Sequence, residues 1–225
     1  MSSPPPMPDI QIVVFDFNGT IVDTVRSTQH VLERLQRQFP DTTGSDTTFP
    51  SPNPSDFPYD SFFQTADLSP DRIPKLIHEL KKELNQENNW LEPLPDIDCV
   101  FQKLAATNIS LGILTSIGAS DVLSFLNQQD FGECVDFLYS SVPTWGKPKV
   151  LSALLKSASL PPSSLLYVSS NLANIQAIRT SQVQIAGVTW GFHQRSDLEK
   201  AFPAYILDSP KEILEVVWQS VKNNC

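Results

Sequence analysis

Residues 10–23 read IQIVVFDFNGTIVD, and this stretch decides the fold. Residues 10–17 are almost all apolar and rich in β-branched side chains, which is typical of a strand buried on both faces. Asp16 lies at the end of this predicted strand, and the turn after it contains Gly19 and Thr20. A carboxylate in such a position, beside the backbone N–H groups of a tight turn, can act as an oxygen nucleophile. The stretch therefore predicts the first strand of a sheet and the start of a functional site.

The rest of the chain alternates between strand and helix patterns. Further apolar runs of the same kind are found at 109–114, 165–168 and 184–189. Alternation of this kind predicts an α/β protein with a doubly wound (Rossmann-like) parallel sheet, in which ligands bind at the carboxyl ends of the strands. Helical periodicity marks the segments 24–38, 72–84, 97–106, 121–129, 149–157, 174–180 and 211–221.

The composition argues against several classes of protein. The chain has 225 residues, and 16 Lys and Arg against 25 Asp and Glu give a formal net charge of −9. A nucleic-acid binder or a binder of anionic membranes normally carries a basic stripe instead. No apolar run approaches the roughly 20 residues that span a bilayer. The three cysteines are widely spaced and form no CxxC pair, which suits a reducing compartment. We expect a cytoplasmic protein that binds neither nucleic acid nor membrane.

Proline is the unusual component, with 19 residues in the chain. The prolines within residues 1–9 indicate a flexible, extended tail. Several more interrupt residues 39–58, where neither a helix nor a strand can continue. Residues 38–71 contain no Lys or Arg, so this Pro-rich loop is either a solvated insertion or an acidic surface for a partner.

Other predicted strands also end in residues that suit a phosphate site. Thr115 and Ser116 follow one predicted strand, and a hydroxyl there can hold a phosphate oxygen. Lys147 lies where a later helix begins and supplies a fixed cation. Another strand is followed by two serines and, one helical turn later, by Asn174. Because the carboxyl ends of parallel strands meet at one edge of a sheet, we expect these groups to lie near Asp16.

In this order and spacing, the segments resemble the haloacid dehalogenase superfamily, and within it the phosphoglycolate-phosphatase-like branch. The likeness covers about residues 10–220 and rests on the pattern DxNGTxxDT at 16–24 and on the string VTWGF at 188–192. The resemblance implies a small helical cap domain inserted after the first strand. The expected domains are a core, 10–20 with 96–225, and a cap, 21–95, which contains the Pro-rich loop.

The resemblance also implies a role for each residue that matches a family motif. Asp16 matches the nucleophile that attacks phosphorus and helps to bind Mg²⁺, and Lys147 matches the stabilising lysine. Asn18 stands where most of the phosphatases have a second aspartate, the general acid and base. It keeps the backbone carbonyl that ligates the metal, but its side chain cannot exchange a proton. The positions that match phosphate-binding residues are Thr20, Thr115, Ser116 and Lys147.

The metal-binding positions depart further from the family. Where the family has Gly-Asp-x-x-x-Asp after a strand, this chain has Ser169, Ser170 and Asn174. Mg²⁺ is normally held by carboxylates together with substrate phosphate. Only the first member of the expected metal set is a carboxylate, so we predict a degenerate metal site that is weak or absent. That set is Asp16, Asn18, Ser170 and Asn174.

Two interpretations of function remain open at the level of sequence. In the first, the protein has the phosphatase fold with weak or lost Mg²⁺-dependent phosphohydrolase activity, and it binds a small phosphorylated metabolite or a protein partner. In the second, it is an active phosphomonoesterase that forms an aspartyl-phosphate on Asp16. The second interpretation needs Mg²⁺ as a cofactor and the first needs none. Turnover of a phosphate ester with and without Mg²⁺ separates an enzyme from a binding protein.

Several of these residues also have a plainer interpretation. Asp16 can be a structural carboxylate at a strand end, Thr115 a hydroxyl that satisfies backbone groups, and Lys147 a charge at a helix start. Trp145 and Trp190 flank the predicted ligand loops, where ordinary packing is the simpler role for an indole ring.

Overall fold

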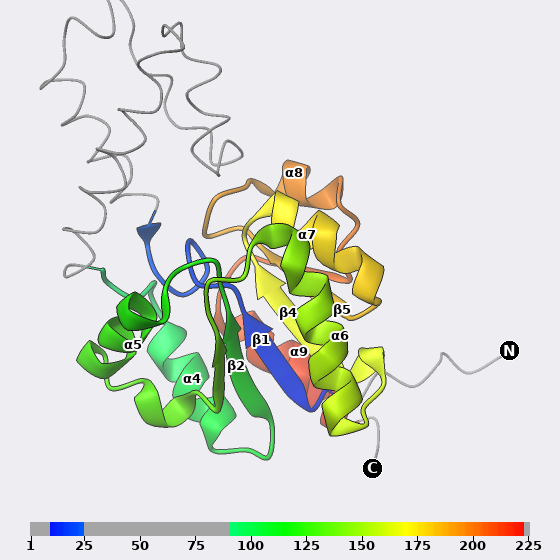
Figure 1. Cartoon of the computed structure of the whole chain (residues 1–225). Coiled ribbons are helices and arrows are strands. Elements are labelled where there is room, and N and C mark those ends of the chain that lie inside the picture. The colour runs from blue at the N-terminus through cyan, green and yellow to red at the C-terminus, as the bar shows by residue number, and fades with distance from the viewer. Residues whose placement is uncertain (1–9, 25–90, 223–225) are drawn as a thin grey trace, which may run out of the picture. The chain divides into compact units, whose positions relative to one another are not determined.

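The computed structural model describes residues 10–24 and 91–222 (Figure 1). Within this part, residues 10–22 and 93–222 form one compact unit, which we call the core unit, and the remaining residues are the ends of a second unit. Several predictions lie outside the described residues: the tail 1–9, the helices at 24–38 and 72–84, the Pro-rich loop 39–58, and with them most of the expected cap 21–95.

The core unit is built on one parallel sheet. Its six strands are β1 (Ile12–Phe15), β2 (Ser110–Leu114), β3 (Phe137–Tyr139), β4 (Leu165–Ser169), β5 (Gln184–Val188) and β6 (Tyr205–Leu207). They lie in the order β3-β2-β1-β4-β5-β6, and every neighbouring pair is parallel. The strand order reverses between β1 and β4, which is where sheets of this kind bind ligands. The predicted doubly wound parallel sheet is confirmed.

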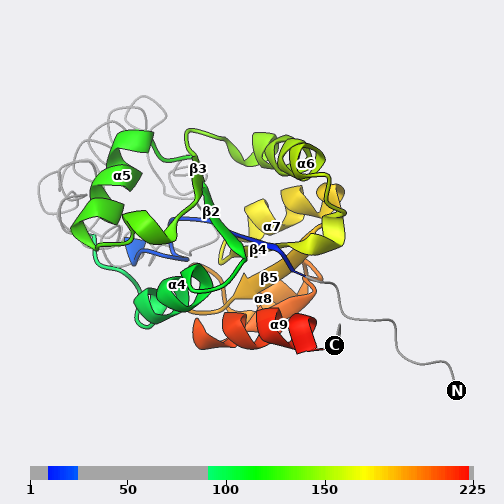
Figure 2. The same cartoon turned by 90° about the horizontal axis from the view of Figure 1, so that it is seen from below.

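Helices cover both faces of the sheet. They are α4 (Ile97–Ala105), α5 (Ala119–Gln128), α6 (Lys147–Ala158), α7 (Leu172–Ile178), α8 (Arg195–Glu199) and α9 (Lys211–Lys222). Figure 2 shows α6 and α7 on one face, and α4 and α9 beside each other on the opposite face. No helix in the described part of the chain is long and apolar enough to cross a membrane.

The central strand β1 explains why both faces are covered. All of its residues are buried, and successive side chains point to opposite faces. Ile12 and Val14 belong to the apolar cluster that includes residues of α6 and α7. Phe15 packs on the other face against Phe101 of α4, with a ring-centroid distance of 5.2 Å. A strand with no polar face has no side to leave in water, so it takes the centre of the sheet.

The chain leaves this strand earlier than the apolar run 10–17 predicts. The ladder ends with the backbone N–H of Asp16, which donates to the O atom of Val168 at 2.9 Å. The carbonyl of Phe17 then closes a turn by accepting from the backbone N of Ile21 at 2.9 Å. Phe17 is buried because it lies inside this turn, and not because the strand continues. The apolar pattern therefore marks burial correctly but overstates the length of the strand.

The sequence does not predict β3, β6 or α8. β3 and β6 have three residues each and partly exposed side chains, so their apolar runs are too short to be recognised as strands. α8 has five residues, which is too short for helical periodicity to be recognised. β3 and β6 are the two edge strands of the sheet, and α8 packs beside β5 and β6. Side chains are less buried there, so the apolar periodicity of the sequence is weaker.

The chain leaves and re-enters the core unit at one place. Val22 forms an antiparallel bridge with Pro93. Beside it, the backbone N of Leu94 donates to the O atom of Ile21 at 2.8 Å. The core unit is therefore closed by direct contacts at the point where the second unit is inserted.

We expect Gly112→Ala to destabilise the core unit. A Cβ atom at Gly112 in β2 would lie 2.0 Å from the ring of Phe137, so the ring or the strand must shift. Overpacking of this kind costs about 1–3 kcal/mol in the free energy of unfolding, measurable as a lower urea midpoint. Gly118→Ala is the matched control, because its Cβ would meet its nearest atom at 3.8 Å. Equal midpoints for the two variants would contradict the packing argument.

Candidate functional site

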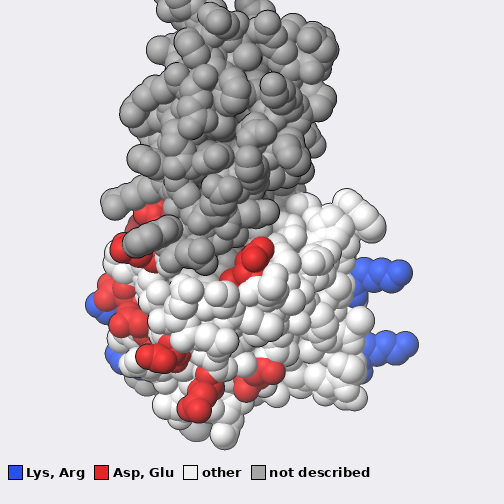
Figure 3. All heavy atoms as spheres, turned by 60° about the vertical axis from the view of Figure 1, so that its left-hand side comes forward, with Lys and Arg blue, Asp and Glu red and all other residues white. Residues whose placement is uncertain are grey.

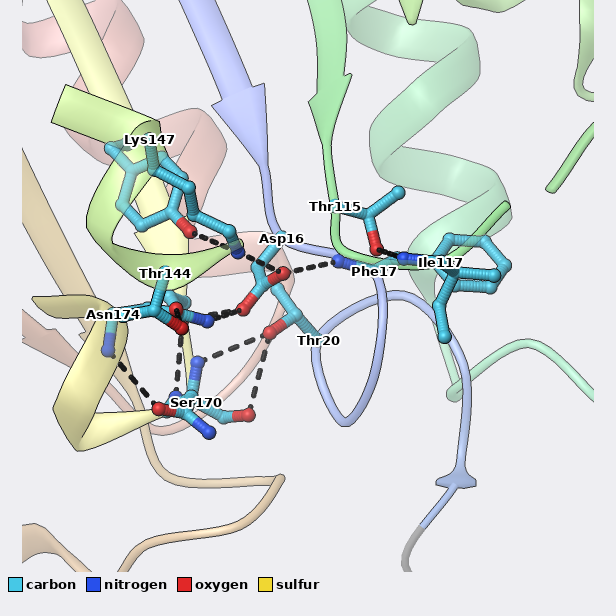
Figure 4. A network of polar contacts seen from close by, with 12 residues as sticks. Asp16, Phe17, Thr20, Thr115, Ile117, Thr144, Lys147, Ser170 and Asn174 are labelled. Carbon is cyan, nitrogen blue, oxygen red and sulfur yellow. Dashed lines mark hydrogen bonds and ion pairs between the residues drawn. The ribbon is translucent and has the colours of Figure 1, made fainter. Parts of the chain in front are cut away.

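Asp16 is the centre of the site, and groups of this chain surround its carboxylate (Figure 4). Oδ1 accepts hydrogen bonds from the backbone N of Phe17 at 3.0 Å and from Nζ of Lys147 at 2.9 Å. Oδ2 accepts from Oγ of Ser169 at 3.1 Å and from Nδ2 of Asn174 at 2.5 Å. A carboxylate offers about four acceptor positions. Each of them is filled by a donor from the protein.

Lys147 forms a buried ion pair with Asp16. Only 1% of the Lys147 side chain and 7% of the Asp16 side chain are exposed. Nζ of Lys147 also donates to the phenol oxygen of Tyr167 on β4 at 3.3 Å. Burial raises the pKa of Tyr167 well above its usual value, the charge of Asp16 raises it further, and a hydrogen bond with Ser169 opposes the shift. The phenol is therefore neutral at physiological pH and supports Lys147 as an uncharged acceptor.

The orientation of the Asn174 amide follows from its two neighbours. A charged carboxylate can only accept hydrogen bonds, so the NH₂ group of Asn174 must face Asp16. The amide oxygen then faces Thr144, whose Oγ1 donates to it at 2.8 Å. Asn174 lies in the first turn of α7, where its backbone N donates to the side chain of the N-cap residue Asn171. Toward Asp16, Asn174 is a hydrogen-bond donor and not a metal ligand.

Thr20 and Ser170 join the turn after β1 to the loop after β4. The backbone N of Ser170 donates to Oγ1 of Thr20 at 3.1 Å, and that hydroxyl donates to Oγ of Ser170 at 3.4 Å. Both residues are fully buried. The sequence assigns Thr20 to phosphate binding and Ser170 to the metal site, whereas the structure shows them in contact with each other.

The remaining predicted residues lie near the same edge of the sheet. Thr115 is buried at the end of β2, and its Oγ1 accepts from the backbone N of Ile117 at 3.1 Å. This hydrogen bond lies within the loop after β2, and satisfying a backbone group is the role that the plainer interpretation gives this hydroxyl. Ser116 is exposed, so its hydroxyl is accessible to a ligand. Asn18 is partly buried.

The structure adds site residues to which the sequence gives no role. In the sequence, Ser169 is singled out only because it stands where the family pattern has glycine. Because Phe15 is in register with Val168, the next residues of the two strands, Asp16 and Ser169, fall side by side. A hydroxyl at the carboxyl end of a predicted buried strand is the signal that could have revealed it. Thr144 and Tyr167 carry no comparable signal in the sequence.

The residues present do not fit Mg²⁺, the ion that the family pattern implies. Mg²⁺ requires oxygen ligands in near-octahedral geometry and is usually bound through carboxylates. Asn174 presents its amide nitrogen, and not its oxygen, to Asp16. The hydroxyl of Ser170 is hydrogen-bonded to Thr20. Among residues 10–24 and 91–222, no group of three or more His, Cys, Asp or Glu side chains is placed to hold a metal ion.

Comparison with known proteins identifies the family of this chain. The sequence model of haloacid dehalogenase-like hydrolases matches residues 13–188. The chain belongs to this family. The predicted superfamily is confirmed by this match, and the relatives described next include a phosphoglycolate phosphatase, in line with the predicted branch.

Two relatives and one solved structure illustrate the likeness of this haloacid dehalogenase-like protein. It is 24% identical over 213 residues to a phosphoglycolate phosphatase of Synechococcus elongatus, covering 95% of this chain and 100% of the relative. It is 21% identical over 218 residues to the pyrophosphatase PpaX of Oceanobacillus iheyensis, covering 94% and 98%. A haloacid dehalogenase-like protein of Streptococcus pneumoniae has the same fold, with a TM-score of 0.75 and 23% identity over 92% of this chain and 98% of that one.

We expect Asp16→Asn to lower the free energy of unfolding by about 3–5 kcal/mol, because it leaves Lys147 buried without its counter-charge. The change also turns an amide toward the NH₂ group of Asn174. Urea unfolding measures the loss. Asp197→Asn is the control, since it removes a partner of Lys200 from an exposed pair and should leave the midpoint near that of the wild type. A wild-type midpoint for Asp16→Asn would contradict a structural role for the buried pair.

Proposed function

We propose that this protein binds a small phosphorylated molecule at the Asp16 site and has weak or no Mg²⁺-dependent phosphohydrolase activity. One observation carries the proposal: four protein donors occupy the Asp16 carboxylate. A nucleophilic carboxylate needs a lone pair free to attack phosphorus. Here both oxygens are held by the protein, and Asn174 occupies the side of Oδ2 with its amide nitrogen.

The charges of the site suit an anion without a metal ion. Asp16 and Lys147 form a pair at 2.9 Å, so the negative charge of Asp16 is already compensated. An approaching phosphate then meets less repulsion than a bare carboxylate would cause. The exposed hydroxyl of Ser116 is an available donor for a phosphate oxygen.

The surface charge favours a small anion over a nucleic acid. On the face in Figure 3, the described acidic side chains lie on the left and in the centre, and the basic ones lie at its edges. Nucleic-acid binding usually uses a basic stripe. Cys99 and Cys134 are free thiols, which supports the reducing cytoplasm as the compartment we propose.

The comparisons favour a second function, an active phosphomonoesterase, over the first. The relative from Synechococcus elongatus is named a phosphoglycolate phosphatase, and the family is one of hydrolases. In such an enzyme Asp16 attacks phosphorus and displaces the alcohol, which takes up a proton from water. A second water molecule then hydrolyses the aspartyl-phosphate to inorganic phosphate and frees Asp16. Mg²⁺ would neutralise charge between nucleophile and phosphate. For Asp16 to react, Ser169 and Asn174 must first release its Oδ2 atom.

We expect millimolar Mg²⁺ to leave both the melting temperature and the turnover of p-nitrophenyl phosphate nearly unchanged. A ligand at a hundred times its dissociation constant stabilises a protein by about 2.7 kcal/mol, which a thermal melt detects easily. Inorganic phosphate, in contrast, should raise the melting temperature in the presence of EDTA. Turnover that depends on Mg²⁺ would establish the second function, and phosphate that stabilises nothing would overturn the first.

We expect the triple variant Asn18→Asp, Ser170→Asp, Asn174→Asp to gain Mg²⁺-dependent turnover of p-nitrophenyl phosphate. Two of the new carboxylates rebuild a metal site, and the third supplies a proton donor worth about 10²–10⁴ in rate. Without Mg²⁺ the variant should melt below the wild type, because a carboxylate would replace the amide that now lies 2.5 Å from Oδ2 of Asp16. Added Mg²⁺ should recover the melting temperature.

The single and double variants serve as controls for this experiment. Asn18→Asp alone should change little, because a proton donor does not help while the metal is absent. The pair Ser170→Asp, Asn174→Asp should recover part of the rate, and the effects should not add, since these residues act as one unit. A triple variant whose melting temperature responds to Mg²⁺ but which hydrolyses no ester would show that the missing carboxylates are not the reason for lost activity.

A further inference from the structure

We propose that residues 190–193, here named the clamp loop, position the two loops that meet at Asp16, so that the site is assembled without a bridging metal ion. Trp190 and Gly191 are the positioning residues. The inference goes beyond the proposed function and does not depend on it, because its test needs neither a ligand nor turnover.

Trp190 connects the clamp loop, which follows β5, to the turn after β1. Nε1 of its partly buried indole donates to the backbone O of Thr20 at 3.2 Å. Oγ1 of the same Thr20 accepts the hydrogen bond from the backbone N of Ser170 at 3.1 Å. Holding the Thr20 backbone in place therefore also holds the contact with the loop after β4. Trp190 acts on the site through Thr20.

Gly191 lets the clamp loop lie against both loops at once. A Cβ atom at Gly191 would lie 1.9 Å from the O atom of Gly19 and 2.4 Å from Cβ of Ser170. No other residue fits there without moving one of the two loops. Gly19 itself has φ +64°, and a Cβ on it would lie 2.7 Å from the ring of Phe192, the next residue of the clamp loop. The three backbones are packed as closely as glycine allows.

His193 extends the clamp loop to the helix that carries Asn174. Its Nδ1 atom lies 2.9 Å from the O atom of Ser170 and 3.3 Å from the backbone N of Leu172. Leu172 is the first residue of α7. The tautomer of this buried ring decides which of the two hydrogen bonds Nδ1 makes, and either one ties the clamp loop to the start of α7 or to Ser170 just before it.

These contacts join the segments that a metal ion would join in the family pattern. One segment ends in Asp16 and the turn with Thr20, and the other carries Ser170 and Asn174. In this chain, the clamp loop touches both segments, and direct hydrogen bonds from Ser169 and Asn174 to Asp16 complete the connection. The string VTWGF, which supports the family resemblance in the sequence, thereby gains a structural role.

Backbone amide hydrogen exchange of the full chain, followed by NMR, tests the proposal. Trp190→Phe keeps an aromatic ring but removes the N–H that binds Thr20. Its Ser170 amide should exchange about tenfold faster than in the wild type, while the amides of β1 and β5 keep their rates. Gly191→Ala should increase the Ser170 rate by more than this. Gly187→Ala is the control in β5, because its Cβ would meet its nearest atoms at 3.4–3.6 Å, an ordinary contact distance.

The outcomes are decisive in both directions. Faster exchange confined to Ser170 and its neighbours in Trp190→Phe, with wild-type rates in Gly187→Ala, supports the clamp. An unchanged Ser170 rate in Trp190→Phe overturns it. An increase shared equally by all strands also overturns it, because it reports a general loss of stability and no local positioning. If Gly191→Ala does not fold, Trp190→Phe decides alone.

Discussion

The buried ion pair between Asp16 and Lys147 sets the conditions for everything around it. Taking two charges out of water costs several kcal/mol for each, and their attraction offsets this only when the remaining polar atoms are also satisfied. The fold meets that condition with elements far apart in the sequence. β1 ends at the carboxylate, α6 brings the ammonium group, β4 brings Tyr167 and Ser169, and α7 brings Asn174.

Neutral donors suit this pair better than acids would. An aspartate at position 174 would face Asp16 with a second negative charge and would need a cation between the two. The amide of Asn174 and the hydroxyl of Ser169 complete the hydrogen bonding of Asp16 and need no further partner. At position 174, the replacement that weakens the family's metal site thus also stabilises the metal-free arrangement.

Local patterns predict the centre of this fold, and contacts between distant segments limit what they predict of the site. The apolar run at 10–17 reveals the central strand because such a strand is buried on both faces. Asp16 and Lys147 are found because each lies at a recognisable element boundary and matches a family motif in the expected order. Ser169 gains its role only from the register of β1 with β4, and Thr144 only from the position of α7. No periodicity in the sequence encodes these two relations, so only the folded chain shows them.

Val22 and Pro93 hold the core unit closed at the point where the second unit is inserted. The chain between these two residues therefore acts on the stability of the core unit as a loop whose two ends are held together. The entropy of closing a loop grows only with the logarithm of its length, so extra residues there cost the core little. The insert can therefore be lengthened, shortened or exchanged with little effect on the stability of the core unit, including the sheet and the Asp16–Lys147 pair.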